Sequence, residues 1–174
     1  MLVSYLGHVP KVHPSAFIAP TAVLIGDVEV GEDSSVWFGT VVRGDCGPIR
    51  IGARCNLQDN AVVHVGNGHP TVIEDDVTLG HGAVAEACHI GRGVVVGNNA
   101  VVLEDVTIGE ETVVGAGSVV AAHSSLPARV LAAGSPARVK KEISGDSAWW
   151  VSEAAPFYVG LGRAYRAEAG AQDE

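Results

Sequence analysis

The chain has 174 residues and a formal net charge of −9, with 47% hydrophobic and only 5% aromatic residues, which suits one domain with a core of small and β-branched side chains. The negative charge argues against nucleic acid or an anionic membrane surface as a partner, and no segment approaches the roughly 20 apolar residues of a membrane span. Because no signal peptide is recognisable and the three cysteines show no CxxC spacing, we expect a cytoplasmic protein in a reducing compartment.

A six-residue repeat, with three short interruptions, runs through most of the chain. The repeated positions are all apolar: Val12, Ile18, Leu24, Val30, Val36, Val42, Ile51, Leu57, Val63, Ile73, Leu79, Ala85, Ile90, Val96, Val102, Ile108, Val114 and Val120. Alternating strands of a β-sandwich would not keep this phase for so long. The repeat therefore predicts an all-β solenoid of about six coils, in which three repeats form one triangular coil and aliphatic side chains fill the axis.

The C-terminal part is expected to differ from the repeats. We predict the solenoid over residues 1–123, an exit loop over 124–143 and a helical segment over 144–174 that packs on the solenoid. The helix itself should run from about Ser152 to Glu168, with Pro156 near its first turn. Gly160 and Gly162 are unfavourable for it.

Two possible metal ligands occupy equivalent positions in neighbouring coils. His64 follows Val63 and Glu86 follows Ala85, and these two axial positions are three repeats apart. Their side chains should therefore stack about 4.8 Å apart and point outward. Two donors at that spacing can share one metal at roughly 2.0–2.2 Å each. His81 should point outward from a different face, so a neighbouring subunit would have to bring a copy of it to the pair.

Several motifs resemble those of one family. The segments 36–45 (VWFGTVVRGD), 56–64 (NLQDNAVVH) and 77–84 (VTLGHGAV), the exit motif GSPA at 134–137 and the segment 158–165 (YVGLGRAY) are similar to gamma-class carbonic anhydrases. The resemblance covers residues 10 to about 168, and the first three motifs in this order and spacing make it specific. It implies a left-handed parallel β-helix of hexapeptide repeats with a C-terminal α-helix, a handedness that periodicity alone does not give.

The resemblance also implies a function and a site. It implies a homotrimer with zinc, or in some members iron or cobalt, at each subunit interface, where metal-bound hydroxide hydrates CO2 reversibly to bicarbonate. His64 of one chain and His81 of its neighbour would be ligands. Gln58 and Asn56 would orient water or substrate, and Tyr158 would approach from the C-terminal helix. Three further residues, which would form a polar network or simply fix the trimer register, are Arg43, Asp45 and Asp59.

The sequence departs from the family pattern at two places. Glu86 stands where the family has its third histidine, so either Glu86 is an oxygen ligand or the site is degenerate. A carboxylate ligand would leave less positive charge on the metal and so slow CO2 hydration. The loop between His64 and Ile73 carries no acid, although the best-known branch of the family has a proton-shuttling glutamate there. His69 is a possible substitute.

Two other functions compete with a carbonic anhydrase. The first is a hexapeptide acyltransferase, in which an interfacial histidine acts as general base on an acyl thioester. The second is a catalytically silent trimer that serves in binding or assembly, which the loss of the third histidine favours. Metal near one equivalent per chain would support the hydratase, coenzyme A binding the acyltransferase, and neither the silent trimer.

Overall fold

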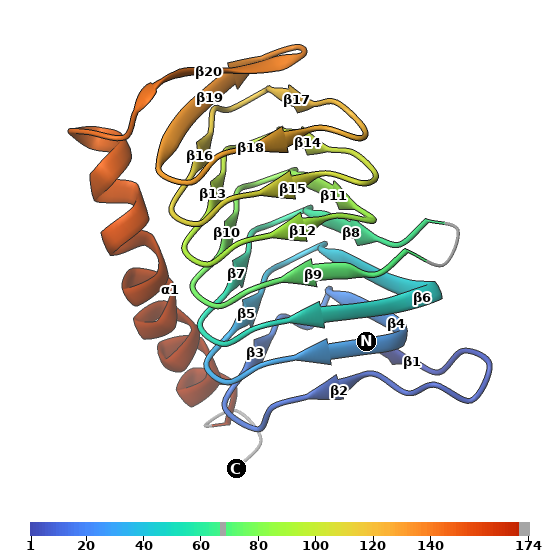
Figure 1. The fold of residues 1–174 in the computed structure, drawn as a ribbon. Helices are drawn as coiled ribbons and strands as arrows, with labels where there is room; N and C mark the ends of the chain where they lie inside the picture. The colour runs from blue at the N-terminus through green and yellow to red at the C-terminus, as the bar shows by residue number, and fades with distance from the viewer. Residues whose placement is uncertain (67–68, 171–174) are drawn as a thin grey trace.

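The chain folds into a parallel β-solenoid of about seven turns, with a helix along one side (Figure 1). The computed structural model describes residues 1–66 and 69–170. In Figure 1 the coils stack one above another and α1 (Asp146–Gly170) descends beside them from the C-terminal end of the stack. This architecture confirms the predicted left-handed β-helix with a C-terminal helix.

The strands are short, and each occupies one side of one coil. They are β1 (Leu2–Val3), β2 (Lys11–Val12), β3 (Phe17–Ile18), β4 (Val23–Val30), β5 (Ser35–Val36), β6 (Val41–Ile51), β7 (Asn56–Leu57), β8 (Val62–His64), β9 (Thr71–Ile73), β10 (Thr78–Leu79), β11 (Val84–Glu86), β12 (His89–Ile90), β13 (Val95–Val96), β14 (Val101–Val102), β15 (Thr107–Ile108), β16 (Val113–Val114), β17 (Val119–Val120), β18 (Ser125–Leu126), β19 (Val130–Gly134) and β20 (Ala137–Glu142). Only β4 and β6 are long enough to bend from one side to the next.

The three sides of the prism follow from how these strands pair. One side stacks β6, β8, β11, β14 and β17, and a second stacks β6, β9, β12, β15 and β18. The third is a separate sheet that runs from β3 through β5, β7, β10, β13, β16 and β19 to β20. The pairing is parallel except between β19 and β20, and equivalent positions of the repeat fall opposite one another in neighbouring coils.

The axis of the solenoid is filled as the repeat predicts. Every repeated position from Leu24 to Val120 is buried, whereas Val12 and Ile18 are partly buried at the first coil. In many repeats the residue two positions before the axial one is small and is buried at a corner of the coil. Two of these residues, Ser34 and Thr40, donate hydrogen bonds of 2.8 Å to backbone carbonyls of the next coil. Polar corners therefore cost little, because their hydroxyl groups are paired.

The predicted exit loop over 124–143 is wrong, because the solenoid continues through it. Leu126 and Ala132 keep the six-residue phase after Val120 and are buried on the axis. Strand β18 pairs with β15, β19 pairs with β16, and β20 folds back antiparallel onto β19. Pro127 directly follows the buried Leu126, and its carbonyl accepts a hydrogen bond of 2.6 Å from Thr112. These extra strands raise the expected six coils to about seven.

The predicted helix is real but begins earlier than Ser152. It starts at Asp146, so Pro156 lies inside it rather than near its first turn. Gly162 faces the sheet, where a Cβ atom would make ordinary van der Waals contacts with the Cβ atoms of Ser35 at 3.4 Å and Phe17 at 3.5 Å. Residues 171–174 of the predicted segment lie outside the described residues. Within 1–66 and 69–170, no helix combines the length and the apolar character that a membrane span requires.

Helix α1 docks on β3, β5 and β7 through aromatic side chains. The ring of Trp37 lies 5.1 Å from that of Phe17, 5.8 Å from that of Tyr158 and 5.1 Å from that of Tyr165, centroid to centroid. At the rim, Arg163 Nη2 donates to Asp33 Oδ2 at 2.8 Å. The aromatic cluster buries apolar surface between the helix and the sheet, and the ion pair adds a polar contact at its rim.

Replacing an axial residue tests the solenoid core. Leu79→Ala should lower the free energy of unfolding by ~2–5 kcal/mol, because Leu79 is fully buried and leaves a cavity. Chemical denaturation would measure the loss. The control Thr107→Ala, on the exposed side of β15, should change it by less than ~0.5 kcal/mol. Equal effects of the two substitutions would contradict the axial position of Leu79.

Docking of α1 should depend on pH through Asp33. The hydrogen bond from Arg163 holds the pKa of Asp33 below its ordinary value. The ion pair therefore stabilises the docked helix above the ordinary carboxyl pKa of ~3.9, and this is lost as the pH falls through the lowered value. Asp33→Asn should speed hydrogen exchange of the C-terminal half of α1 at neutral pH and remove its acid dependence. The control Glu111→Gln should do neither.

Candidate functional site

His64 lies in a cluster of charged side chains on the side formed by β6, β8 and β11. Arg43, His64 and Glu86 are paired rungs of these three strands, as the three-repeat spacing predicts for the last two. His64 Nδ1 lies 3.2 Å from Glu86 Oε1, and His64 Nε2 lies 3.2 Å from Asp45 Oδ1. One imidazole is thus held between two carboxylates, and its ring orientation is fixed from both ends.

Asp45 is fixed in turn by Arg43, which donates a hydrogen bond to its other carboxylate oxygen. Burial raises the pKa of Asp45, but the hydrogen bonds from Arg43 and His64 outweigh burial and keep this pKa below its ordinary value. Asp45 is therefore ionised at neutral pH. The cluster presents two carboxylates against one guanidinium, so it favours a cation at His64.

A second group lies on the other sheet, near α1. His81 follows β10, and its Nδ1 lies 2.9 Å from Asp59 Oδ2. Gln58 Nε2 donates to Asn56 Oδ1 at 3.1 Å, and Asn56 Nδ2 donates to Thr78 Oγ1 at 2.8 Å. Asn56 and Gln58 are buried, whereas His81 is half-exposed. This pairing leaves Nε2 of His81 as the ring nitrogen open to another ligand.

Tyr158 joins this second group from α1. Its ring packs edge-on against Trp37, and it lines a hollow together with Gln58 and His81. Burial, and then the charge of Asp59, raise the pKa of Tyr158 above its ordinary value. The hydroxyl group therefore keeps its proton near neutral pH and can donate a hydrogen bond into the hollow.

The structure gathers the predicted site residues into two groups but does not join the groups. Arg43, Asp45, His64 and Glu86 come together on one side, and Asn56, Gln58, Asp59, His81 and Tyr158 on another. In the described part of this chain, no three His, Cys, Asp or Glu side chains are arranged to hold a metal ion. A single chain therefore brings neither His81 nor its partners to His64.

Sequence reasoning missed Asn98, whose Oδ1 accepts a hydrogen bond of 3.1 Å from the backbone N–H of His81. A signal for it exists in the repeat. Asp59, His81 and Asn98 each stand two residues after an axial position, in three successive coils. They form a polar column along the solenoid, and His64 and Glu86 form another on β8 and β11. The three-repeat spacing in the sequence therefore identifies the members of both columns.

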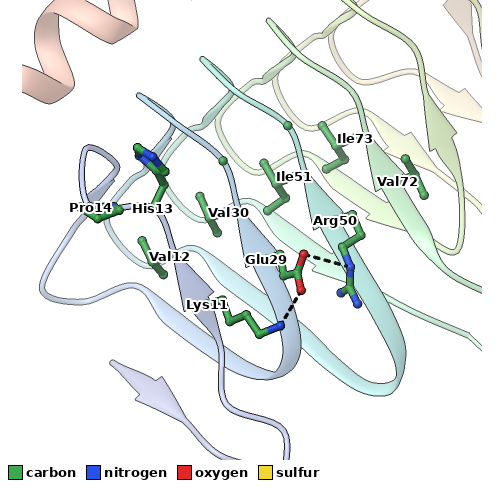
Figure 2. A pocket seen from close by; sticks show the side chains of 12 residues that line it. Lys11, Val12, His13, Pro14, Glu29, Val30, Arg50, Ile51, Val72 and Ile73 are labelled. Atoms are coloured by element: carbon green, nitrogen blue, oxygen red, sulfur yellow. Dashed lines mark hydrogen bonds and ion pairs between the residues drawn. The ribbon is translucent and has the colours of Figure 1, made fainter.

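A larger hollow lies away from both groups. It measures about 720 Å³ and lies across the first coils, where Figure 2 shows Glu29 between Lys11 and Arg50. Glu29 carboxylate oxygens lie 3.0 Å from Lys11 Nζ and 3.5 Å from Arg50 Nε. Each charge there is matched by a neighbour, and none of the predicted site residues lines this hollow. The smaller hollow at Gln58, His81 and Tyr158, of about 320 Å³, is the one that carries candidate chemistry.

Known proteins are similar in sequence to this chain over most of its length. The family model "Bacterial transferase hexapeptide (six repeats)" matches residues 87–122. The "Probable carbonic anhydrase" of Methanocaldococcus jannaschii is 51% identical, over 83% of this chain and 91% of its own length. The "Carbonic anhydrase" of Geobacillus kaustophilus is 38% identical, over 96% of this chain and 92% of its own length. The chain belongs to the gamma carbonic anhydrase-like family of hexapeptide-repeat proteins.

Membership of the gamma carbonic anhydrase-like family agrees with the fold. A crystal structure of a Bacillus cereus protein, provisionally described as an acetyltransferase, is 39% identical and superposes with a TM-score of 0.93, over 96% of this chain and 97% of that one. The chain spans 63% of the length of gamma carbonic anhydrase 1 of Arabidopsis thaliana, to which it is 36% identical. The names given to these relatives thus include both a hydratase and a transferase.

Proposed function

We propose that this protein catalyses the reversible hydration of CO2 to bicarbonate at the interfaces of a homotrimer. Zinc, or alternatively iron or cobalt, would be held by His64 and Glu86 of one chain and His81 of its neighbour. One observation carries the proposal: His64 and Glu86 are in register on adjacent strands, with the imidazole facing the carboxylate. The family of the chain supports the reaction.

The donor set fits a divalent metal. The 3.2 Å between His64 Nδ1 and Glu86 Oε1 is close to the separation of two atoms that share one metal at ~2.1 Å each. Asp45 at the other ring nitrogen would act as the carboxylate that commonly orients a ligating histidine. Asp59 stands in the same relation to His81. Bound there, the metal would act as a Lewis acid that makes water nucleophilic near neutral pH.

The second group supplies the polar contacts for the substrate. The bond to Asn56 fixes the amide of Gln58, which faces the same hollow as His81. Tyr158 keeps its proton and can donate a hydrogen bond to an oxygen of CO2 or bicarbonate. Asn56 acts through Gln58, so we assign Asn56 a positioning role. These groups are held before substrate arrives, which reduces the reorganisation that the reaction needs.

Arg43, Asp45 and Asp59 are positioning residues in this proposal. Arg43 holds Asp45, and Asp45 holds the ring of His64. Asp59 holds the ring of His81 in the same way. Their alternative role, fixing the register of subunits through charge pairs, would use the same contacts.

Glu86 should make the reaction slower than three neutral imidazoles would. A carboxylate ligand donates negative charge to the metal and weakens its pull on the electrons of water. A neutral histidine at this position, as in the family pattern, would leave more positive charge on the metal. We therefore expect a hydratase of modest rate rather than one near the diffusion limit.

An acyltransferase remains the second candidate. The matched family model is described as a bacterial transferase, and the Bacillus cereus structure carries an acetyltransferase description. In that case His64 or His81 would act as general base, and the protein would bind coenzyme A without metal. Calorimetric titration with coenzyme A separates the two functions. A trimer that binds neither coenzyme A nor metal would be a silent assembly subunit.

Metal content tests the shared site. His64→Ala and His81→Ala should each abolish the metal found by elemental analysis after expression with zinc, iron or cobalt, because each removes a ligand from every interface. Co-expressed in equal amounts, the two variants should recover about a quarter of the wild-type metal, since each mixed trimer keeps one intact interface.

The control for this experiment is His89→Ala, because His89 is half-exposed and pairs with Glu74 instead. It should keep the full metal content. Retention of metal in either ligand variant would contradict the assignment of that histidine. Loss in both variants without recovery in the mixture would contradict sharing between subunits.

Replacing Glu86 tests its place in the site. Glu86→His should raise metal affinity by about tenfold, a difference of ~1.4 kcal/mol, because an imidazole nitrogen suits zinc or iron better than a carboxylate oxygen does. It should raise the CO2 hydration rate by a similar factor, because a neutral ligand leaves more charge on the metal. Chelator competition and stopped-flow hydration measure the two quantities. Glu86→Gln, which keeps the shape and removes the charge, should weaken metal binding. Unchanged values for both variants would remove Glu86 from the site.

A further inference from the structure

The sheet that faces α1 changes character halfway along the solenoid. One outward column is formed by the residue after each axial position. Between β5 and β16 this column changes from the large Trp37 and Gln58 to Gly80, Gly97 and Gly115. Helix α1 packs on β3, β5 and β7, where the large side chains stand. Next to β10, β13 and β16 the glycines leave a gap, which is the hollow of about 320 Å³ that Gln58, His81 and Tyr158 line.

Stacking of the coils requires these glycines. A Cβ atom at Gly97 would lie 2.6 Å from the backbone nitrogen of Ala116, and one at Gly80 would lie 2.8 Å from that of Asn98. Neither contact can be relieved without moving a coil. The gap beneath α1 is therefore a fixed feature of the backbone and not an accident of side-chain packing.

The two ends of this cleft differ in chemistry. A second outward column, parallel to the glycines, reads Asn56, Thr78, Val95 and Val113. Polar groups thus surround the end at Gln58 and His81, whereas Val95, Val113 and the ring of Trp150 enclose the other end. A volume of this size lies at the lower bound of small-molecule pockets, and its lining suits a ligand with one polar and one aliphatic end.

We propose that this cleft binds the aliphatic chain of a short carboxylate, whose carboxylate group lies beside Gln58, His81 and Tyr158. The proposal rests on the proposed function, because that carboxylate would occupy the place of bicarbonate. Bicarbonate itself has no apolar atoms to fill the far end. The charge of Asp59 is engaged by His81 at 2.9 Å, and the hydroxyl of Tyr158 stays protonated as a donor for the carboxylate.

Titration of the metal-loaded, full-length protein with acetate, butyrate and hexanoate tests this binding by calorimetry. Affinity should rise about fourfold per methylene, as expected when each CH2 leaves water for an apolar pocket. Val113→Phe should fill the far end and reduce the affinity for hexanoate towards that for acetate. The matched control Thr107→Phe, at an exposed position of β15 on another side of the prism, should leave the affinity for hexanoate unchanged.

Equal affinities for the three carboxylates would overturn the proposal, as would hexanoate binding that Val113→Phe leaves intact. Equal affinities are also the result expected if a neighbouring subunit fills the cleft. Hydration assays on the same preparations separate this proposal from the function on which it rests. If the protein hydrates CO2 but its affinity for carboxylates does not rise with chain length, only the proposal for the cleft is overturned. If the affinity rises with chain length but no CO2 hydration is measured, only the proposed hydratase function is overturned.

Discussion

Stacking in register, with three repeats to each coil, is the constraint on which the rest of this structure depends. It turns position within a six-residue repeat into position in space, because the same repeat position recurs directly above itself in the next coil. The aliphatic axis, the paired corner hydroxyls and the glycine column are all columns of this kind. The contact between His64 and Glu86 is another, made by residues 22 apart in the chain.

This constraint explains how much of the fold and site the sequence could predict. The solenoid and the stacking of His64 on Glu86 follow from periodicity, which needs no knowledge of long-range packing. The last turn was missed because Pro127 and the GSPA motif at 134–137 resemble a loop, although Leu126 and Ala132 keep the phase. The contact of Asp45 with His64 was beyond prediction from spacing, since Asp45 stands in an insertion that has no repeat position.

The start of α1 could not be predicted for a different physical reason. Its sequence contains Pro156, Gly160 and Gly162, which disfavour a helix by local propensity. Docking against Trp37 overrides that propensity, and Gly162 lies where the helix meets Ser35 and Phe17. The extent of such a helix is determined by the surface on which it packs and not by its local propensity. The metal and its third ligand remain predictions, because they depend on a second chain.

The antiparallel strand β20 has a consequence for the solubility of the fold. A parallel solenoid ends in an open row of backbone donors and acceptors, which is a template on which another chain can add a coil. Here β20 turns back over β19 and covers part of that row with a highly exposed strand that carries Arg138, Lys140 and Lys141. Its reversed direction and positive charges oppose the addition of a further parallel coil at this end.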